Sequence, residues 1–175
     1  MRHFGKMLAV AALAMISYSA NAELAPQWSK GTMIGNINIG AIPFGSSVSL
    51  DYVLVDEWWK GHFSVGGEFD IADNDRNNRH YDNYKCTAIG VTPRATYGLN
   101  ITPEFEVHAT VCVGFGVRTW SWKYDNVRYK ENDSFVLWNE FVGCRYFFND
   151  CFGVMAETGY SNWFPEFRLG LNFKF

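Results

Sequence analysis

Several features that would narrow the search for a fold are missing from this sequence of 175 residues. Beyond the first 22 residues, no uninterrupted apolar run reaches the roughly 20 residues that a membrane-spanning helix requires. No C-x-x-C or H-x-x-x-H spacing is present, and such spacings accompany many zinc sites. Linkers, internal repeats and low-complexity segments are absent as well. The sequence therefore predicts a single domain with no resident metal or cofactor.

An excess of positive charge is missing too. The chain has 15 Lys and Arg residues against 18 Asp and Glu residues, and its net charge is −3 with neutral histidines. Arg2 and Lys6 belong to an N-terminal segment that we expect to be removed, so the remainder is more acidic still. An acidic chain without a basic stripe argues against nucleic acid as a partner.

The first 22 residues have the layout of a secretory signal peptide. Arg2 and Lys6 precede a short apolar run at 7–16, and Ala20-Asn21-Ala22 forms a small-x-small cleavage site. The apolar run is too short to span a membrane, and no cysteine lies near the cleavage site to carry a lipid anchor. We therefore expect a signal peptide at 1–22, a short N-terminal segment at 23–30 and one folded domain at 31–175.

What the sequence does have is alternation. In its last ten residues apolar and polar side chains alternate strictly, which is the period of a strand with two different faces. One face carries Phe167, Leu169, Leu171, Phe173 and Phe175, and the other carries Glu166, Arg168, Gly170, Asn172 and Lys174. No segment follows that could cover the apolar face, so we expect this face to contact lipid.

The same period recurs upstream and predicts eight strands. They are expected near 32–42, 47–55, 62–72, 84–99, 105–118, 135–148, 152–160 and 166–175. Within the sixth, Glu140 falls among the apolar positions, which predicts a β-bulge near Asn139-Glu140. Connections at 56–61, 100–103 and 149–150 are short, whereas 72–83 and 123–133 are expected to be longer polar loops on the other side, an arrangement typical of outer-membrane barrels.

Aromatic residues make up 18% of the chain and gather near the expected strand ends, as they do at membrane interfaces. The set on the side of the short turns is Trp58, Trp59, Phe105, Phe147, Phe148, Phe152 and Phe173. The set on the side of the long loops is Trp120, Trp122, Tyr124, Phe135, Trp138, Tyr160, Trp163 and Phe164. Two such girdles around an aliphatic belt indicate a membrane location.

Charged residues on strand after strand indicate which face is inside. The polar face carries Asp51, His62, Glu68, Asp70, Arg94, Glu106, His108, Arg118, Arg145, Glu157, Glu166, Arg168 and Lys174. An apolar face turned inward, as in a soluble periplasmic carrier of the lipocalin type, would overfill an eight-stranded interior. Charges turned inward can instead form a network of ion pairs, which is how buried charges persist.

We therefore predict an all-β fold: an eight-stranded antiparallel up-and-down transmembrane β-barrel with a polar interior and no open pore. The C-terminal strand is expected to close the barrel by pairing with the strand at 32–42. The soluble carrier is kept as an alternative.

Four cysteines follow the signal peptide, and export would expose them to oxidising conditions. Cys86 and Cys112 lie on adjacent expected strands, at similar distances from the connection 100–103. Cys144 and Cys151 flank the next short turn. We predict the disulfides Cys86–Cys112 and Cys144–Cys151, with four free thiols acting as small apolar groups as the alternative.

Residues able to carry out chemistry are few. His62 and His108 fall on the charged face beside acids, where a proton relay is one reading and a structural place in the polar network is the simpler one. His80 and Asp82 lie in the first long loop, where a lipid-modifying barrel enzyme would carry its catalytic groups, but no serine adjoins His80. We expect no enzymatic activity and no catalytic residues, with lipid A acyl chemistry as the alternative.

Residues 31–175 resemble the small eight-stranded outer-membrane β-barrel family, the OmpA- and OmpX-like group. The resemblance rests on the signal peptide, the alternating strands, the turn NITPEF at 100–105 and the ending LGLNFKF at 169–175. It implies an integral protein of the bacterial outer membrane, with a role in envelope integrity or in surface interaction through loops 72–83 and 123–133.

The resemblance also implies partners. These are outer-membrane lipid and lipopolysaccharide, periplasmic chaperones, and the barrel-assembly machinery, which would read Leu169, Leu171, Phe173 and Phe175 as an assembly signal. The protein is expected to be a monomer. The four cysteines depart from the commonest family pattern, and no peptidoglycan-binding domain follows the barrel, so anchoring to the cell wall is not expected.

Overall fold

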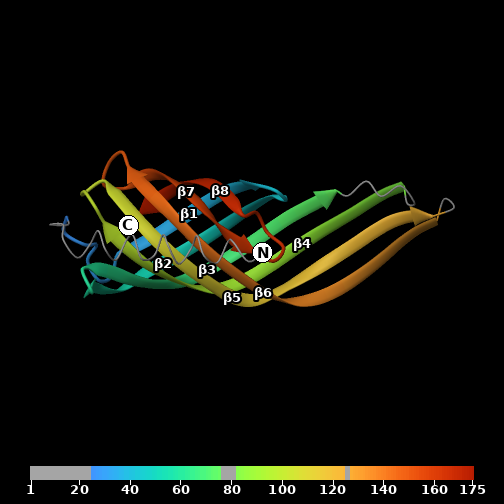
Figure 1. Cartoon of the computed structure of the whole chain (residues 1–175), viewed down its shortest axis with the longest axis horizontal. Coiled ribbons are helices and arrows are strands. Elements are labelled where there is room, and N and C mark those ends of the chain that lie inside the picture. The colour runs from blue at the N-terminus through green and yellow to red at the C-terminus, as the bar shows by residue number, and fades with distance from the viewer. Residues whose placement is uncertain (1–24, 76–81, 125–126) are drawn as a thin grey trace.

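The computed structural model describes residues 25–75, 82–124 and 127–175. They form one closed antiparallel β-barrel in which each strand pairs with the next along the chain (Figure 1). The strands are β1 (Met33–Ala41), β2 (Phe44–Trp58), β3 (Gly61–Asp75), β4 (Asp82–Asn100), β5 (Phe105–Tyr124), β6 (Val127–Phe147), β7 (Phe152–Ser161) and β8 (Phe167–Lys174). The predicted eight-stranded up-and-down architecture is confirmed, while several strands extend beyond the expected ranges.

The barrel closes through its first and last strands. β8 lies antiparallel to β1, from Ile34 opposite Lys174 to Ala41 opposite Phe167. This pairing confirms the closing role predicted for the alternating C-terminal segment. Because every backbone group of a closed barrel can find a partner on a neighbouring strand, the fold exposes no sheet edge in its closed part.

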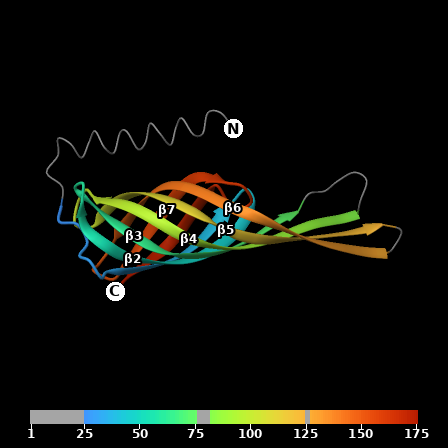
Figure 2. The same ribbon diagram turned by 90° about the horizontal axis from the view of Figure 1, so that it is seen from below.

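The strands differ greatly in length around the barrel. β1, β7 and β8 contain 8 to 10 residues, whereas β4, β5 and β6 contain 19 to 21. The long strands therefore continue past the closed ring as a narrow sheet (Figures 1 and 2). We call this sheet the projection and define it as residues 85–88 of β4, 119–123 of β5 and 127–134 of β6.

The prediction of a loop at 123–133 was wrong, because most of this segment is strand. β5 and β6 pair without a break from Phe105 opposite Tyr146 to Tyr124 opposite Val127. A polar segment can still form strands when both of its faces meet water, and sequence polarity alone does not distinguish the two cases. Of the predicted loop 72–83, residues 72–75 belong to β3 and 82–83 to β4, and 76–81 lie outside the described residues.

The predicted bulge at Asn139-Glu140 was also wrong. β6 pairs in continuous register with both neighbours at these positions, and register shifts occur instead in β2, between Val53 and Trp58, and in β4, between Asp82 and Lys85. Glu140 simply faces outward, where its carboxylate accepts a hydrogen bond of 2.7 Å from the indole nitrogen of Trp138. A local donor, rather than a shift in register, accommodates this charge among apolar neighbours.

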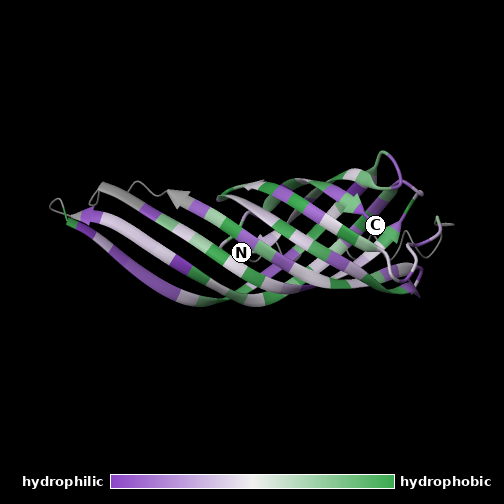
Figure 3. Ribbon diagram, turned by 180° about the vertical axis from the view of Figure 1, so that it is seen from behind, coloured by the Kyte–Doolittle hydropathy of each residue, from purple (hydrophilic) through white to green (hydrophobic). Residues whose placement is uncertain are grey.

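The barrel is apolar outside and polar inside. Outward side chains such as Ile39, Val91 and Phe115 are 60–77% exposed, whereas Asp51 and His108 are fully buried in the interior. Hydrophobic and hydrophilic residues alternate along the ribbons accordingly (Figure 3). This polarity is the reverse of a lipocalin-type carrier, so the soluble alternative was wrong. No helix in the described part of the chain is long and apolar enough to cross a membrane.

Two small apolar clusters close the interior, one at each end. Trp28, Ile34, Val53 and Phe147 form the first, on the side of the short turns, and Ala72, Ala88, Leu137 and Phe164 form the second, on the side of the projection. Phe147 and Phe164 were predicted as girdle residues, and that assignment was wrong. Each is at most 3% exposed. Phe147 points inward from β6, and Phe164 lies in the β7–β8 connection and folds over the barrel mouth.

The N-terminal segment enters the barrel at the turn side. The indole of Trp28 lies 4.7 Å from the His62 ring and contacts Phe147 edge-on at 5.5 Å, measured between ring centroids. The Gln27 side-chain oxygen accepts a 3.0 Å hydrogen bond from the backbone nitrogen of Asn100, whose own side-chain amide donates to Pro26. The predicted short N-terminal segment is thus a plug, fixed by the Trp28 ring and by these two hydrogen bonds.

Replacing Trp28 by Ala should lower the free energy of unfolding by about 3–5 kcal/mol, because the substitution empties the centre of an apolar cluster. Urea unfolding of the protein refolded in lipid vesicles, followed by electrophoretic mobility, measures the change. Trp59→Ala is the control, since Trp59 is 76% exposed in the β2–β3 turn. Equal losses for the two variants would contradict the plug.

Candidate functional site

The interior network is the largest assembly of chemically active groups in the described residues. Strand alternation turns every second side chain inward, and ten of the thirteen residues on the predicted charged face lie there, each at most 3% exposed. They are Asp51, His62, Glu68, Asp70, Arg94, Glu106, His108, Arg145, Glu157 and Arg168.

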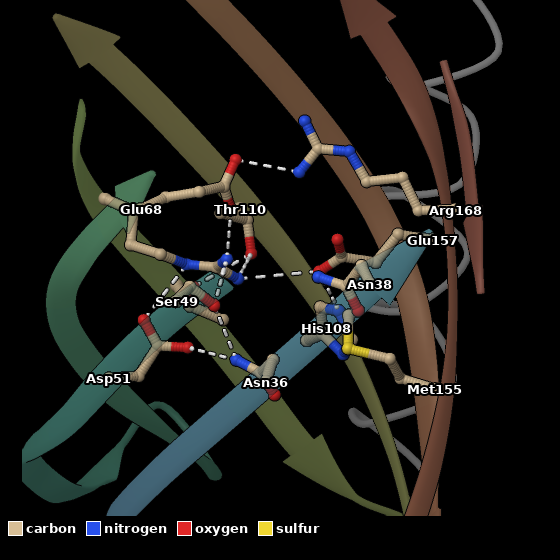
Figure 4. A network of polar contacts seen from close by, with 12 residues as sticks. Asn36, Asn38, Ser49, Asp51, Glu68, His108, Thr110, Met155, Glu157 and Arg168 are labelled. Carbon is tan, nitrogen blue, oxygen red and sulfur yellow. Dashed lines mark hydrogen bonds and ion pairs between the residues drawn. The ribbon is translucent and has the colours of Figure 1, made fainter. Parts of the chain in front are cut away.

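Arg94 of β4 lies at the centre of this network. Its guanidinium contacts Asp51 of β2 at 3.0 Å, Glu157 of β7 at 3.5 Å, and Glu68 of β3 through a short hydrogen bond. The hydroxyl oxygens of Ser49 and Thr110 accept further hydrogen bonds from the same group. One cation thus joins strands from opposite sides of the barrel. Figure 4 shows its acidic partners Asp51, Glu68 and Glu157 within the network.

Two further arginines extend the network toward the barrel ends. On the projection side, Arg168 donates to Glu68 at 2.7 Å and to Asp70 at 3.1 Å, and its guanidinium stacks over Phe141 at 4.0 Å. On the turn side, Arg145 contacts Glu106 at 3.1 Å. Arg145 also lies 3.4 Å from Asp51, which links this end to Arg94.

His108 connects two acids through its two ring nitrogens. Nδ1 lies 3.5 Å from Glu106 Oε1 and Nε2 lies 3.0 Å from Glu157 Oε1. His62 is 3.9 Å from the same Glu106 oxygen on one side and stacks on Trp28 on the other. Both imidazoles therefore occupy structural places between charged groups, and Trp28 covers His62 from the turn side.

Glycines make room for these two rings. Gly98 lies opposite His62 and Gly143 opposite His108 in the strand register. A Cβ at residue 143 would come within 2.8 Å of His108 Nε2 and 2.7 Å of the Glu157 side chain. Only a residue without a side chain leaves the space that a ring needs beside an ion pair in so narrow a barrel.

Uncharged polar residues complete the network and were not singled out in the sequence. Asn36 Nδ2 donates to Ser49 at 2.8 Å, Asn172 Nδ2 donates to Asn36, and the Thr96 and Thr110 hydroxyls lie 2.8 Å apart. Ser161 donates to Asn139 in the same way. Their inward parity was visible in the alternation, but only charged residues were counted as members.

Arg118 and Glu166 do not belong to the network, so these two predictions were wrong. Arg118 has the inward parity but lies above the closed ring, where it pairs with Asp133 and stacks on Trp163 at 4.1 Å. Glu166 is exposed and precedes β8, which begins at Phe167. The alternation along a strand predicts which face a side chain lies on. It predicts burial only where that strand is part of the closed ring.

Both predicted disulfides were wrong, since no disulfide joins any two of the four cysteines. The register places Cys86 opposite Trp120 and Cys112 opposite Arg94, so the two thiols are eight positions apart, roughly 26 Å along the ladder. A disulfide requires Cα atoms less than about 7 Å apart. Cys144 lies opposite Ala156 within the β6–β7 ladder, whereas Cys151 precedes β7 in an exposed turn.

The residues considered for catalysis in the first long loop contribute little to the described structure. His80 and the side chain of Asp82 lie outside the described residues. Asp73 accepts a 2.8 Å hydrogen bond from the Thr87 hydroxyl across the β3–β4 ladder. Within the described ranges, no group of three His, Cys, Asp or Glu side chains is arranged to hold a metal ion.

Replacing Arg94 by Met should destabilise the protein by about 3–5 kcal/mol, because buried carboxylates would lose their shared cation. The same unfolding measurement applies. The control is Arg118→Met, whose ion-pair partner Asp133 is half exposed, so the loss should be about 1 kcal/mol or less. Comparable losses at both positions would show that the network is not the main electrostatic support.

All four cysteines should react with an alkylating reagent when the purified protein is denatured without prior reduction. Intact mass measurement counts the adducts. A lower count that rises to four after reduction would show that a disulfide forms despite the register.

Comparison with known proteins agrees with this geometry. Residues 7–175 match the model of the family described as outer membrane protein beta-barrel domain. Comparison with curated protein sequences finds no match.

Several solved structures share the fold. Ail, the attachment invasion locus protein of Yersinia pestis, is 13% identical with a TM-score of 0.54, covering 84% of this chain and 100% of Ail. The N-terminal β-barrel domain of Pseudomonas aeruginosa OprF is 13% identical with a TM-score of 0.53, covering 85% and 100%. Neisserial surface protein A is 13% identical with a TM-score of 0.50, covering 82% and 94%. The eight-stranded inside-out barrel and the family match lead to one conclusion: this chain belongs to the outer membrane protein beta-barrel family.

Proposed function

We propose that this protein is a sealed, non-enzymatic barrel of the bacterial outer membrane that acts by contact, presenting its projection outside the cell. The observation that carries the proposal is the contrast between a barrel whose interior holds a paired charged network capped by apolar clusters at both ends and a sheet of three strands that continues beyond it. A transport function would need an open lumen. A contact function needs a rigid surface held away from the membrane.

The filled interior supports the absence of a pore. Arg94, Arg145 and Arg168 each bridge at least two carboxylates, and an eight-stranded barrel has little more interior than its side chains occupy. Trp28 and Phe164 cover the two ends. Opening a path would separate several buried ion pairs at once, at a cost of several kcal/mol each.

The projection has its own supports. Trp122 and Tyr129 stack across β5 and β6 at 5.9 Å, and Trp163 stacks on Arg118 at its base. Trp163 also contacts Phe135 and Trp120. These contacts hold the sheet against the rim of the barrel, as a presenting surface requires.

The solved structures that share the fold include proteins whose names state surface roles. One is called an attachment invasion locus protein and another a surface protein. These names support a surface role here. Export through a cleaved signal peptide and a monomeric state are parts of the same proposal.

Thiol labelling on cells tests the seal and the orientation together. Three single-cysteine variants are needed, retaining Cys112, retaining Cys151, or carrying Lys130→Cys. On intact cells, a membrane-impermeant maleimide should label only Lys130→Cys. After the outer membrane is permeabilised it should also label Cys151, which is exposed in a turn, but not Cys112, which is buried in the lumen. Labelling of Cys112 at the rate of Cys151 would overturn the sealed barrel.

The contact role is tested by shortening the hairpin. Residues 120–131 replaced by Asn-Gly, a sequence suited to a tight hairpin turn, should leave a barrel with unchanged heat-modifiable mobility. Cells producing the intact chain should adhere to protein-coated surfaces more than cells producing the shortened one, with equal resistance to detergent. Equal adhesion with a difference in detergent resistance would favour an envelope-integrity role instead.

A further inference from the structure

The outward face of the projection carries Lys123, Arg128 and Lys130 and continues the outward face of β5 beyond the closed ring. We propose that this face binds the phosphate groups of phosphorylated glycolipid in the outer leaflet, chiefly through Lys123, Arg128 and Lys130. The inference rests on the outward orientation of the projection given above, and it names the molecule that the projection would contact first.

The position of the face follows from strand parity. On β5, the lipid-facing residues Val113, Phe115 and Val117 are 43–77% exposed. The same parity continues through Thr119 and Ser121 to Lys123, so one uninterrupted face changes from apolar to polar to basic. At about 3.3 Å per residue and a tilt near 45°, four to six residues beyond Val117 correspond to roughly 9–14 Å above the apolar band.

The second observation is that β6 sorts its charges by sign. Arg128 and Lys130 lie opposite Lys123 and Ser121 and share their outward face. Glu131 and Asp133 have the other parity, opposite Trp120 and Arg118, and Asp133 pairs with Arg118 there. The outer face of this hairpin is therefore cationic, and its inner face carries the acids and aromatics.

One residue pair on this face, between β5 and β6, places two positive charges side by side. Lys123 and Arg128 are direct cross-strand partners, an arrangement that is destabilising without a compensating anion. Together with Lys85, Ser121 and Trp122 they line a surface hollow of about 240 Å³. Toward β3 the register sets Asp75 opposite Lys85 and Asp82 opposite Lys123, so the positive excess lies on the β5–β6 rungs.

Protection of a free strand edge does not account for this pattern. β6 pairs with β7 only from Asn139 onward, and the Asn162 side chain bonds the backbone of Val136 and Trp138. Residues 127–135 therefore form an edge, and charged side chains discourage pairing at edges. That purpose needs charge of either sign. Here the positive side chains lie only on the face of the hairpin that points toward lipid, which requires an anionic layer on that side. Phosphates fit this requirement because they accept several hydrogen bonds from Lys and Arg.

Retention of lipid A by the refolded full-length mature protein tests the proposal. The protein in neutral detergent is mixed with bisphosphorylated or dephosphorylated lipid A, separated by gel filtration, and analysed for bound lipid. Wild type should retain the phosphorylated form preferentially. Each charge near an anionic surface contributes about fivefold in affinity, so Lys123→Gln/Arg128→Gln/Lys130→Gln should retain at least about tenfold less, and Arg128→Gln alone should fall between.

Matched controls separate this surface from its alternatives. Glu131→Gln, on the other face of the same strand, should retain as much as wild type, and all variants should keep the heat-modifiable mobility of a folded barrel. Raising the salt concentration should reduce retention because exposed charges are screened.

Three results would overturn the proposal: equal retention of both lipid forms by wild type, unchanged retention by the triple variant, or displacement by soluble tripolyphosphate at equal phosphate concentration, which would indicate a site for soluble polyanions. None of these results depends on the labelling of Lys130→Cys on cells, so failure here and failure of the proposed orientation are distinguishable.

Discussion

A single buried guanidinium organises this barrel. Arg94 is 2% exposed and faces three carboxylates from three other strands. A charge in that position is tolerated only when partners surround it, and each of those partners is in turn shared with Arg168, Arg145 or His108. The ion pairs therefore constrain one another, and together they constrain the register of the strands that carry them, because a slip of one residue would turn the whole set toward lipid.

The network also explains how so small a barrel can be closed without a hydrophobic core of ordinary size. The apolar residues of this chain are used on the outside, where they meet lipid. Inside, a few apolar side chains suffice at the two ends, where water would otherwise reach the charges. Trp28 performs this role on the turn side. It can dock only when the surrounding strands have formed its site, because that site is made by residues of β1, β2 and β6.

The unequal strand lengths determine what faces the exterior. On one side β7 and β8 turn back at a short connection, and on the other β5 and β6 continue together for most of another strand length. Once these strands leave the closed ring, both of their faces are accessible. One face of the hairpin then points toward the membrane and the other lies above the barrel mouth. On β6 the basic residues Arg128 and Lys130 are on the first face, and the acidic residues Glu131 and Asp133 are on the second.

The alternation in the sequence was sufficient to predict the strand number, the inward position of ten charged residues and the closure of β8 on β1, because a period of two depends only on the backbone of each strand. Register, strand extension and enclosure depend on neighbours. For this reason Cys86 and Cys112 were paired wrongly, the hairpin at 123–133 was taken for a loop, and Arg118 and Glu166 were placed inside a ring that does not extend to them. The plug formed by Gln27 and Trp28 had no periodic signal at all, since it is a tertiary contact between an irregular segment and side chains of several strands. Sequence by itself determined which side chains share a face; only the tertiary structure decided which of those faces are enclosed, and therefore which charges must be paired.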